Sequence, residues 1–372
     1  MMLLQTFFLF SLFWNPLMAA EPIKKKVEEK VEPRGQDLRT FIGSTFSPPV
    51  AFEGKIYFVA TTGVLYEGAP DLSTVTKLFI GKKQTLGNLT LHDGILFWGE
   101  GLHTDTKTVL YSFDIKMKKV KEIPVEGHIE RAPFISEGVL YTGLGPQGVA
   151  AFKADTLQKL WQTKEIEKKA IHADGNIVSY KGDICTTSIY DFKAIICMEA
   201  KTGKISQSYS LKKNPKSEIV LTKDYLVGIA TEADMTKPVW TLPSNFYVVD
   251  LAQKKIHLEK ELRGFNYFAP LIDEDVAYVT LSTGEFLSLK LSDGKIGYIG
   301  EFQEPFINNA FFLKEAVCSL GVMGKLLCYS KGKSTWGLSS DKRYMESPIG
   351  KTALVNGSTY APSRVGYFLV EP

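Results

Sequence analysis

The chain has 372 residues, of which 44% are hydrophobic and 23% are charged, a composition typical of a globular protein. Its formal net charge of +3 is too small for the clustered basic surface that binds nucleic acid, so we expect no nucleic-acid partner. A closed all-β fold of this length is often a single domain.

Residues 1–20 (MMLLQTFFLFSLFWNPLMAA) have the outline of a secretory signal peptide: an uncharged apolar run followed by small residues at Ala19 and Ala20. The run is short for a bilayer span, although a retained N-terminal anchor is the alternative. No Cys follows it, so we see no bacterial lipid-attachment site. We therefore expect a secreted, periplasmic protein that does not span the membrane once the signal is removed.

Residues 21–37 form a charged segment with five basic and five acidic side chains. It contains few apolar groups to bury, which predicts a disordered linker. The lysines at 24–26 suggest membrane-surface binding as an alternative, but the neighbouring glutamates cancel their charge.

Residues 132–161 (APFISEGVLYTGLGPQGVAAFKADTLQKLW) contain the clearest copy of a repeat. Short apolar runs separated by Gly, Pro and Asp predict four strands, at 132–136, 139–142, 149–153 and 159–161. The rest of the chain repeats this pattern with a period of about 40–50 residues, which indicates a repeat architecture.

Eight copies can be aligned, starting at Ser47, Leu89, Ala132, Ala170, Glu218, Ala269, Ala310 and Ser347. The turn before the second strand is expected near Gly54, Gly94, Gly138, Gly175, Asp224, Asp275, Glu315 and Gly357. The fifth copy carries an insertion at residues 231–244. Residues 38–372 are thus one repeat domain.

Eight units of four strands predict an all-β fold, an eight-bladed β-propeller with four-stranded antiparallel blades. Two packed sandwiches would instead show cleaner alternation and a central linker. The last copy supplies only three strands, and an unpaired edge is a liability. We therefore expect residues 38–44 to pair with the last blade as its outer strand and to close the ring.

The four cysteines fall into two pairs, each on the second and third strands of one blade: Cys185 with Cys197, and Cys318 with Cys328. Directly opposed residues of an antiparallel hairpin are close enough for a disulfide. An even number in a secreted chain favours bridging, and buried free thiols are the alternative.

The third copy, with its Ala154–Thr156 turn and Trp161, resembles the repeat of the pyrroloquinoline-quinone-like β-propellers. Residues 199–204 (EAKTGK) and 291–295 (LSDGK) match the same turn, and Trp336 occupies the place of Trp161. The resemblance covers residues 38–370 and implies the propeller fold.

Two branches of this family imply different functions. The quinoprotein dehydrogenases hold their cofactor with adjacent cysteines, a Trp platform and calcium ligands. This chain has no Cys–Cys dipeptide, so that site does not carry over and no cofactor is expected. The periplasmic scaffold branch, typified by the propeller lipoprotein of the outer-membrane β-barrel assembly machinery, is more similar in size, blade number and export, but this chain lacks the lipidated Cys.

No sequence motif predicts catalysis or metal binding. The five histidines are dispersed, without CxxC or HxxxH spacing, and His92 and His172 lie near inner strands, where a packed His is the simpler interpretation. The acidic residues Glu53, Asp93, Glu137 and Asp174 recur with the repeat, which indicates turn formation. The Gly-rich turn at 143–148 opens no helix, so it is not a phosphate loop. We thus expect no catalytic, cofactor-binding or metal-binding residues.

Arginines and aromatic residues precede several first strands, in loops that the fold should bring to one face: Arg131, Arg263, Phe265, Tyr267, Arg343 and Tyr344. Such residues are enriched at interface hot spots, so they are the candidate partner surface. The alternative is that the aromatics wedge between blades and the arginines are solvated.

The leading functional hypothesis is a non-enzymatic periplasmic scaffold that binds envelope or outer-membrane assembly proteins. The alternative is a ligand binder or divergent quinoprotein-type enzyme that uses the central channel. Converging polar groups with shifted pKa values would favour the second, and an apolar and Arg-containing patch on the rim would favour the first.

Overall fold

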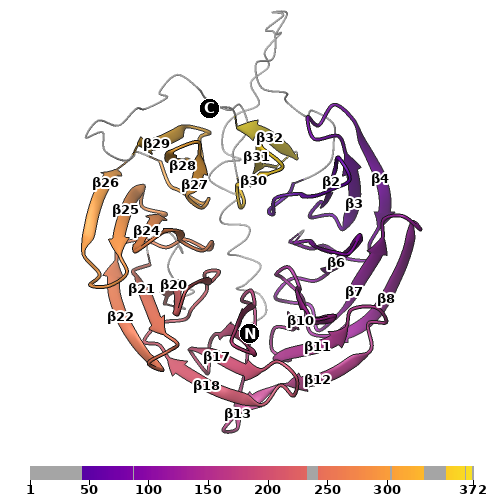
Figure 1. Cartoon of the computed structure of the whole chain (residues 1–372), viewed down its shortest axis with the longest axis horizontal. Helices are drawn as coiled ribbons and strands as arrows, with labels where there is room; N and C mark the ends of the chain where they lie inside the picture. Colours follow the sequence, from indigo (N-terminus) through magenta and orange to yellow (C-terminus); the bar gives the residue numbers. More distant parts are fainter. Residues whose placement is uncertain are drawn as a thin grey trace, which may run out of the picture.

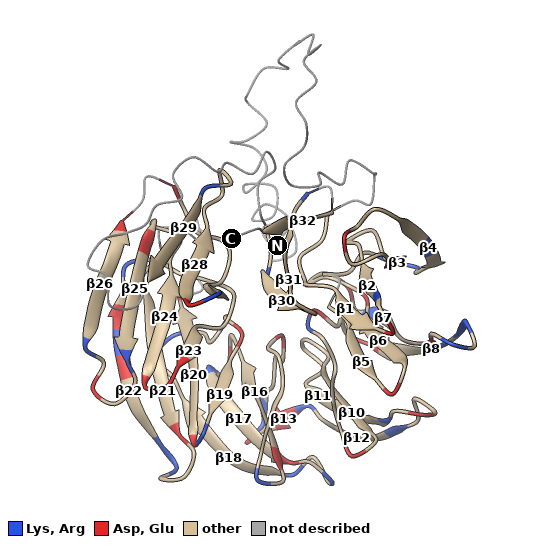
Figure 2. Cartoon of the chain, turned by 45° about the horizontal axis from the view of Figure 1, so that its top comes forward, with Lys and Arg blue, Asp and Glu red and all other residues tan. Residues whose placement is uncertain are grey.

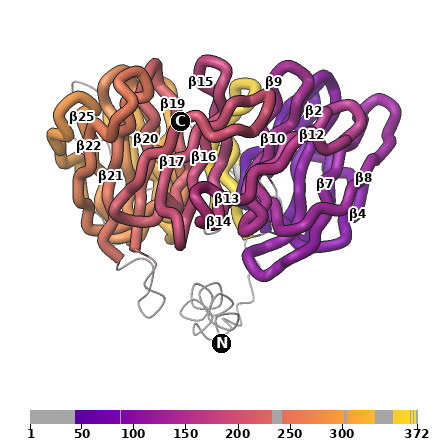
Figure 3. Tube along the Cα trace, turned by 90° about the horizontal axis from the view of Figure 1, so that it is seen from below, coloured from indigo at the N-terminus to yellow at the C-terminus, as the bar shows by residue number. Residues whose placement is uncertain are grey.

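The computed structural model describes residues 44–86, 88–232, 242–301, 304–330, 349–364 and 366–370. The described strands form a ring of eight blades, each running from the centre of the ring to its rim (Figure 1). Seen from the side, the strands cross the thickness of the ring from one face to the other (Figure 3). The predicted all-β, eight-bladed propeller is confirmed.

Blades 1 to 3 follow one another along the first half of the chain, each with its strands in sequence order. Their strands are β1 (Val50–Phe52), β2 (Lys55–Val59), β3 (Val64–Gly68), β4 (Val75–Ile80); β5 (Thr90–His92), β6 (Ile95–Gly99), β7 (Lys107–Asp114), β8 (Lys119–Glu126); and β9 (Phe134–Ser136), β10 (Val139–Gly143), β11 (Val149–Lys153), β12 (Lys159–Thr163). A short ribbon of β13 (Glu165–Ile166) and β14 (Lys169–Ala170) precedes blade 4.

Blades 4 to 6 are also four-stranded. Their strands are β15 (Val178–Tyr180), β16 (Asp183–Ser188), β17 (Ala194–Glu199), β18 (Ile205–Ser210); β19 (Val220–Thr222), β20 (Tyr225–Thr231), β21 (Ser244–Asp250), β22 (Lys255–Leu262); and β23 (Leu271–Asp273), β24 (Val276–Thr280), β25 (Glu285–Lys290), β26 (Ile296–Glu301). Three strands each are described for blade 7, β27 (Phe311–Leu313), β28 (Ala316–Leu320), β29 (Leu326–Ser330), and blade 8, β30 (Ala353–Val355), β31 (Ser358–Pro362), β32 (Tyr367–Val370).

No helix in these described ranges is long and apolar enough to cross a membrane.

A tight turn with positive φ joins the two innermost strands of every blade. Its first residue has φ between 47° and 55° in all eight copies: Glu53, Asp93, Glu137, Lys181, Lys223, Glu274, Lys314 and Asn356. In five copies a Gly with positive φ follows, the pattern of a type I′ hairpin turn. The repeated acidic residues at 53, 93 and 137 are thus turn residues, as predicted.

The fourth copy corrects one prediction. The turn expected near Gly175 lies at Lys181 and Gly182 instead, so the first strand of blade 4 is β15 and begins at Val178. Asp174 is therefore not a turn residue of the repeat. It lies in the connection that leads into the blade.

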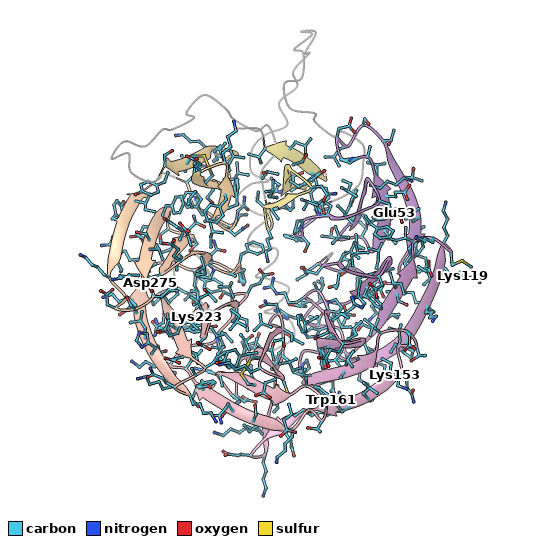
Figure 4. The ribbon with its side chains drawn as sticks, in the orientation of Figure 1. Glu53, Lys119, Lys153, Trp161, Lys223 and Asp275 are labelled. Carbon is cyan, nitrogen blue, oxygen red and sulfur yellow. A yellow bond between two sulfur atoms is a disulfide. The ribbon has the colours of Figure 1, made fainter. Side chains whose placement is uncertain are left out.

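Neighbouring blades pack face to face, so the inner strands are buried on both sides. Between blades 2 and 3, Phe97 and Leu110 pack with Leu140 and Phe152, and a similar apolar layer fills the other interfaces. Trp161 on β12 (labelled in Figure 4) belongs to the layer between blades 3 and 4, where its indole Nε1 donates a hydrogen bond to the carbonyl oxygen of Ala200 at 3.0 Å. Blade-to-blade burial supplies the core that no single blade could form.

Both predicted disulfides are present. Cys185 pairs directly with Cys197 across β16 and β17, and Cys318 with Cys328 across β28 and β29. The Cα atoms are 4.1 and 4.0 Å apart, as in a non-hydrogen-bonded antiparallel pair.

The first described residues meet the last blade. Thr45 donates a hydrogen bond from its backbone nitrogen to the carbonyl oxygen of Ser363 (3.0 Å), and Tyr367 donates one from its hydroxyl to the carbonyl oxygen of Ser47 (2.5 Å). Of the predicted closing strand only Ser44 lies within the described residues. The predicted signal segment, the linker and residues 233–241 of the fifth-copy insertion lie outside them.

Candidate functional site

Polar side chains from three blades meet on one face of the ring, close to its axis. This face carries the turns between second and third strands and the connections between successive blades, since strands alternate in direction. His103 lies in the turn between β6 and β7, and His128 follows β8. His172 and Asp174 lie between β14 and β15. These four residues are called the histidine cluster.

Asp174 is the centre of the histidine cluster. Its Oδ1 lies 2.9 Å from His128 Nε2, and its Oδ2 lies 3.0 Å from His172 Nε2 and 3.4 Å from His103 Nδ1. One polar atom from each of the four residues can be chosen so that all lie within 4.8 Å of one another. The carboxylate of Glu130 adjoins the cluster, 2.9 Å from His103 Nδ1.

The Gly-rich turn of blade 3 holds the histidine cluster in place. The backbone of Gly145 exchanges two hydrogen bonds, of 2.8 and 3.1 Å, with Ala173, the residue between His172 and Asp174. Gly145 has a φ of +57°, and a Cβ there would lie 2.3 Å from the His128 ring. Only glycine allows this close approach.

A second layer of residues orients the imidazoles. His128 Nδ1 faces the carbonyl oxygen of Asp105 at 3.3 Å, and the His128 ring is fully buried. The backbone nitrogen of His172 donates to Ser188 Oγ (3.2 Å), and the Tyr190 ring packs edge-on against the His172 ring at 4.8 Å. Lys216 Nζ lies over this Tyr190 ring, 5.4 Å from its centroid.

The local field favours cations. Burial alone would lower the pKa of His103, but Glu130 and Asp174 outweigh it and raise that pKa to about 9. Burial would raise the pKa of Asp174, but its histidine neighbours hold it well below the usual range. Burial also lowers the pKa of Lys216, partly against the attraction of these two carboxylates. At His103 the negative charge thus overcomes the cost of burying a positive charge, whereas at Lys216 the effect of burial prevails.

A second group of charges ties three blades together near the axis. Glu218, before β19, accepts a hydrogen bond from Lys351 Nζ (2.8 Å) and one from Arg131 Nη1 (3.3 Å). These residues belong to the connections into blades 5, 8 and 3. Glu218 is 5% exposed. Burial would raise its pKa, but Lys351 and Arg131 outweigh that effect and lower it.

The residues of the predicted partner surface do not form one patch in the structure. Arg131 belongs to the charged group around Glu218, and Phe265 is buried between blades with 2% exposure. Tyr267 is 38% exposed, and desolvation of its hydroxyl raises the pKa of that group to about 12. The Arg263 side chain is 80% exposed, and Arg343 and Tyr344 lie outside the described residues. Arg263 is therefore the predicted member that a partner can reach most readily.

Arg263 adjoins an apolar part of the rim. On β26, the outer strand of blade 6, Ile296 is 38% and Tyr298 is 57% exposed. The Tyr298 hydroxyl donates to Glu301 Oε2 (3.1 Å). Desolvation and Glu301 raise the pKa of this hydroxyl, and the positive charge of Arg263 partly offsets that rise. Ile296, Tyr298 and Arg263 are called the β26 patch.

Sequence reasoning missed the histidine cluster because its members come from three separate connections. His92, the other histidine considered, lies on β5 beside Asp93 and lines a separate cleft with Phe52 and Met117. The one signal available was the connection into blade 4, where residues 164–177 are twice as long as residues 127–133 before blade 3.

Comparisons with known proteins show the fold and leave the family open. No protein-family model matches the chain, so the resemblance to pyrroloquinoline-quinone-like repeats stays a prediction. Two solved structures match in shape: BamB from Moraxella catarrhalis, with a TM-score of 0.65 and 10% identity over 87% of this chain and 92% of that one, and the computationally designed Ika8 protein, with 0.63 and 12% over 88% and 96%.

Two curated relatives are uncharacterized proteins of Rickettsia. The protein from Rickettsia prowazekii (strain Madrid E) is 23% identical over 55% of this chain, and the one from Rickettsia conorii is 21% identical over 55%. In each case the match covers 48% of the relative, so the chain spans about half the length of the curated relatives it matches.

Proposed function

We propose that this protein is a periplasmic, non-enzymatic scaffold that binds protein partners in envelope or outer-membrane protein assembly. The signal-like N-terminus supports export, and the resemblance of the repeat to the periplasmic scaffold branch supports the role. The likeness in fold to BamB extends over most of both chains. Fold alone does not assign function, so the role must rest on a surface.

The β26 patch is the observation that carries this proposal. The outer strands β4, β8, β12 and β22 carry lysines, as at Lys119 and Lys121 of β8, and such charges discourage pairing with other chains. The outer strand β18 (ISQSYS) has no cation either, but it exposes no large apolar side chain. The sequence of β26 (IGYIGE) has no cation and exposes two large side chains, two residues apart on one face. Figure 2 shows the strand in neutral colour over most of its length.

No described strand pairs with the outer edge of β26, which ends its sheet. We propose that an extended segment of a partner adds to this edge, with backbone hydrogen bonds giving affinity and Tyr298 giving specificity. The Arg263 side chain is 80% exposed and lies 3.9 Å from Glu285 Oε1, so an acidic group of that segment would compete with Glu285 for it.

Site-specific photocrosslinking in intact cell envelopes tests the proposal. A photoreactive residue at position 298 should give one discrete adduct with an outer-membrane assembly protein, and Ile296→Lys should reduce its yield several-fold. The matched control places the photoreactive residue at Ile80, which is 60% exposed on β4. Equal adducts at both positions, or none at position 298, would contradict a docking edge on blade 6.

A ligand binder acting near the axis of the ring is the second candidate function. The observation that favours it is the histidine cluster, where polar side chains from three blades converge with shifted pKa values. The two candidates use different residues, in blade 6 and in blades 2 to 4, and can both be true.

A further inference from the structure

The histidine cluster has the donor set of a transition-metal site. Imidazole nitrogen and carboxylate oxygen are ligands that Zn²⁺ takes in proteins, commonly four at a time. Three of the five histidines of the chain and one Asp supply this set. They come from three successive blades, so their meeting depends on how blades 2, 3 and 4 pack.

The distances fit a metal of this kind. In a tetrahedral site with bonds of about 2.0–2.1 Å, neighbouring ligand atoms lie roughly 3.3 Å apart. The three contacts between Asp174 and the imidazoles span 2.9 to 3.4 Å. The four ligand atoms as a set lie within 4.8 Å of one another, so the side chains would have to close in around the ion.

Two buried atoms of the cluster have no hydrogen-bond partner within the described residues: His172 Nε2 and Asp174 Oδ2. They lie 3.0 Å apart, and the Asp174 side chain is only 10% exposed. Unless a proton or a cation is shared between them, neither buried atom is satisfied, and that is costly. A cation between them would accept a lone pair from each and remove that cost.

The surroundings also have the form of a second coordination layer. A ligating His usually donates its other N–H to a carbonyl or carboxylate, which fixes the ring. His128 Nδ1 faces the Asp105 carbonyl oxygen and leaves Nε2 facing Asp174. Glu130 adds negative charge beside His103, and the fully buried His128 ring keeps one side of the site dry.

We propose that the histidine cluster binds one Zn²⁺ ion, or a similar divalent transition-metal ion, through His103, His128, His172 and Asp174. This inference goes beyond the scaffold role and does not depend on the β26 patch. The ion would tie together the connections of blades 2, 3 and 4.

Titration calorimetry of the intact, EDTA-treated protein with ZnCl₂ tests the site, and visible absorption with Co²⁺ reports the geometry. We expect one ion per chain and a tetrahedral Co²⁺ spectrum. His103→Gln and His172→Gln should each weaken Zn²⁺ binding at least about 10-fold. The His103 side chain is 35% exposed, so that variant should fold, and circular dichroism checks both.

His92→Gln is the matched control, because His92 is a part-exposed histidine that also contacts an Asp but lies outside the cluster. It should bind Zn²⁺ as the native protein does. The site is refuted if the native protein takes up no Zn²⁺, or if all three variants bind it equally well. The cluster would then be an ion-paired group of protonated histidines around a carboxylate.

Discussion

The connections into blades 3 and 4 do the same topological task in different ways. Residues 127–133 take the chain from β8 to β9 by a short path, and the hairpin that follows turns at Glu137 and Gly138. Residues 164–177 include a ribbon, then His172 and Asp174, before β15 begins. The shorter path carries one member of the histidine cluster, His128, with Glu130 beside the cluster, whereas the longer one carries two members, His172 and Asp174.

The difference between the two connections shows where a repeat protein can place functional residues. Both blades keep the hairpin with positive φ, the apolar inner strands and four-strand order. The departure is confined to a connection, where extra residues disturb no strand pairing. Functional residues tend to lie on such loops, held by a rigid scaffold.

The largest expected effect comes from comparing two aspartates. In EDTA-treated protein, Asp174→Ala should lower the free energy of unfolding by about 3–5 kcal/mol, because it removes the buried carboxylate that partners His128 and His103. Asp93→Ala removes an exposed turn carboxylate and should cost far less. Urea unfolding followed by circular dichroism measures both. Similar losses in the two variants would show that the contacts of Asp174 with the histidines do not stabilise the fold.

The two disulfides provide a second comparison. Replacing Cys185 and Cys197 by Ala should cost about 3 kcal/mol from chain entropy, and the pair Cys318 and Cys328 should cost about the same. Only the variant without Cys185 and Cys197 should also weaken Zn²⁺ binding. Cys185 lies on β16, and Ser188 at the end of that strand accepts a hydrogen bond from the backbone nitrogen of His172. If both double variants bind Zn²⁺ equally, blade 4 does not support the cluster.

The smallest expected effect is the difference in stability cost between Ala substitutions at two glycines with positive φ. Gly138→Ala meets no atom within 4 Å and should cost about 1 kcal/mol from backbone strain. Gly145→Ala adds a clash with the His128 ring and should cost about 2–3 kcal/mol in total. Thermal unfolding of both variants measures the difference. Equal costs would mean that His128 moves away freely.

Much of the fold could be predicted from the sequence because its signals are local. Turn residues and apolar runs gave the strands of blade 3 nearly as they are, and opposed hairpin positions gave both disulfides. The error in blade 4 was also local. Residues 172–175 (HADG) resemble residues 91–94 (LHDG), so Asp174 was aligned with the turn at Asp93, while the true turn uses Lys181.

The histidine cluster could not be predicted because its members meet only when three successive blades have packed side by side. His103, His128 and His172 have no common spacing, and each is unremarkable within its own repeat. The same holds for Glu218 with Arg131 and Lys351, which belong to three separate blades. Contacts of this kind depend on blade number and on the lengths of the connections.

X-ray absorption at the zinc edge, on the intact protein loaded with one equivalent of Zn²⁺, tests the central claim most directly. The account predicts nitrogen and oxygen neighbours at about 2.0–2.1 Å, with the outer-shell signal of several imidazoles, and loss of that signal in His172→Gln. A spectrum of hydrated zinc without imidazole, or one unchanged in His172→Gln, would contradict it.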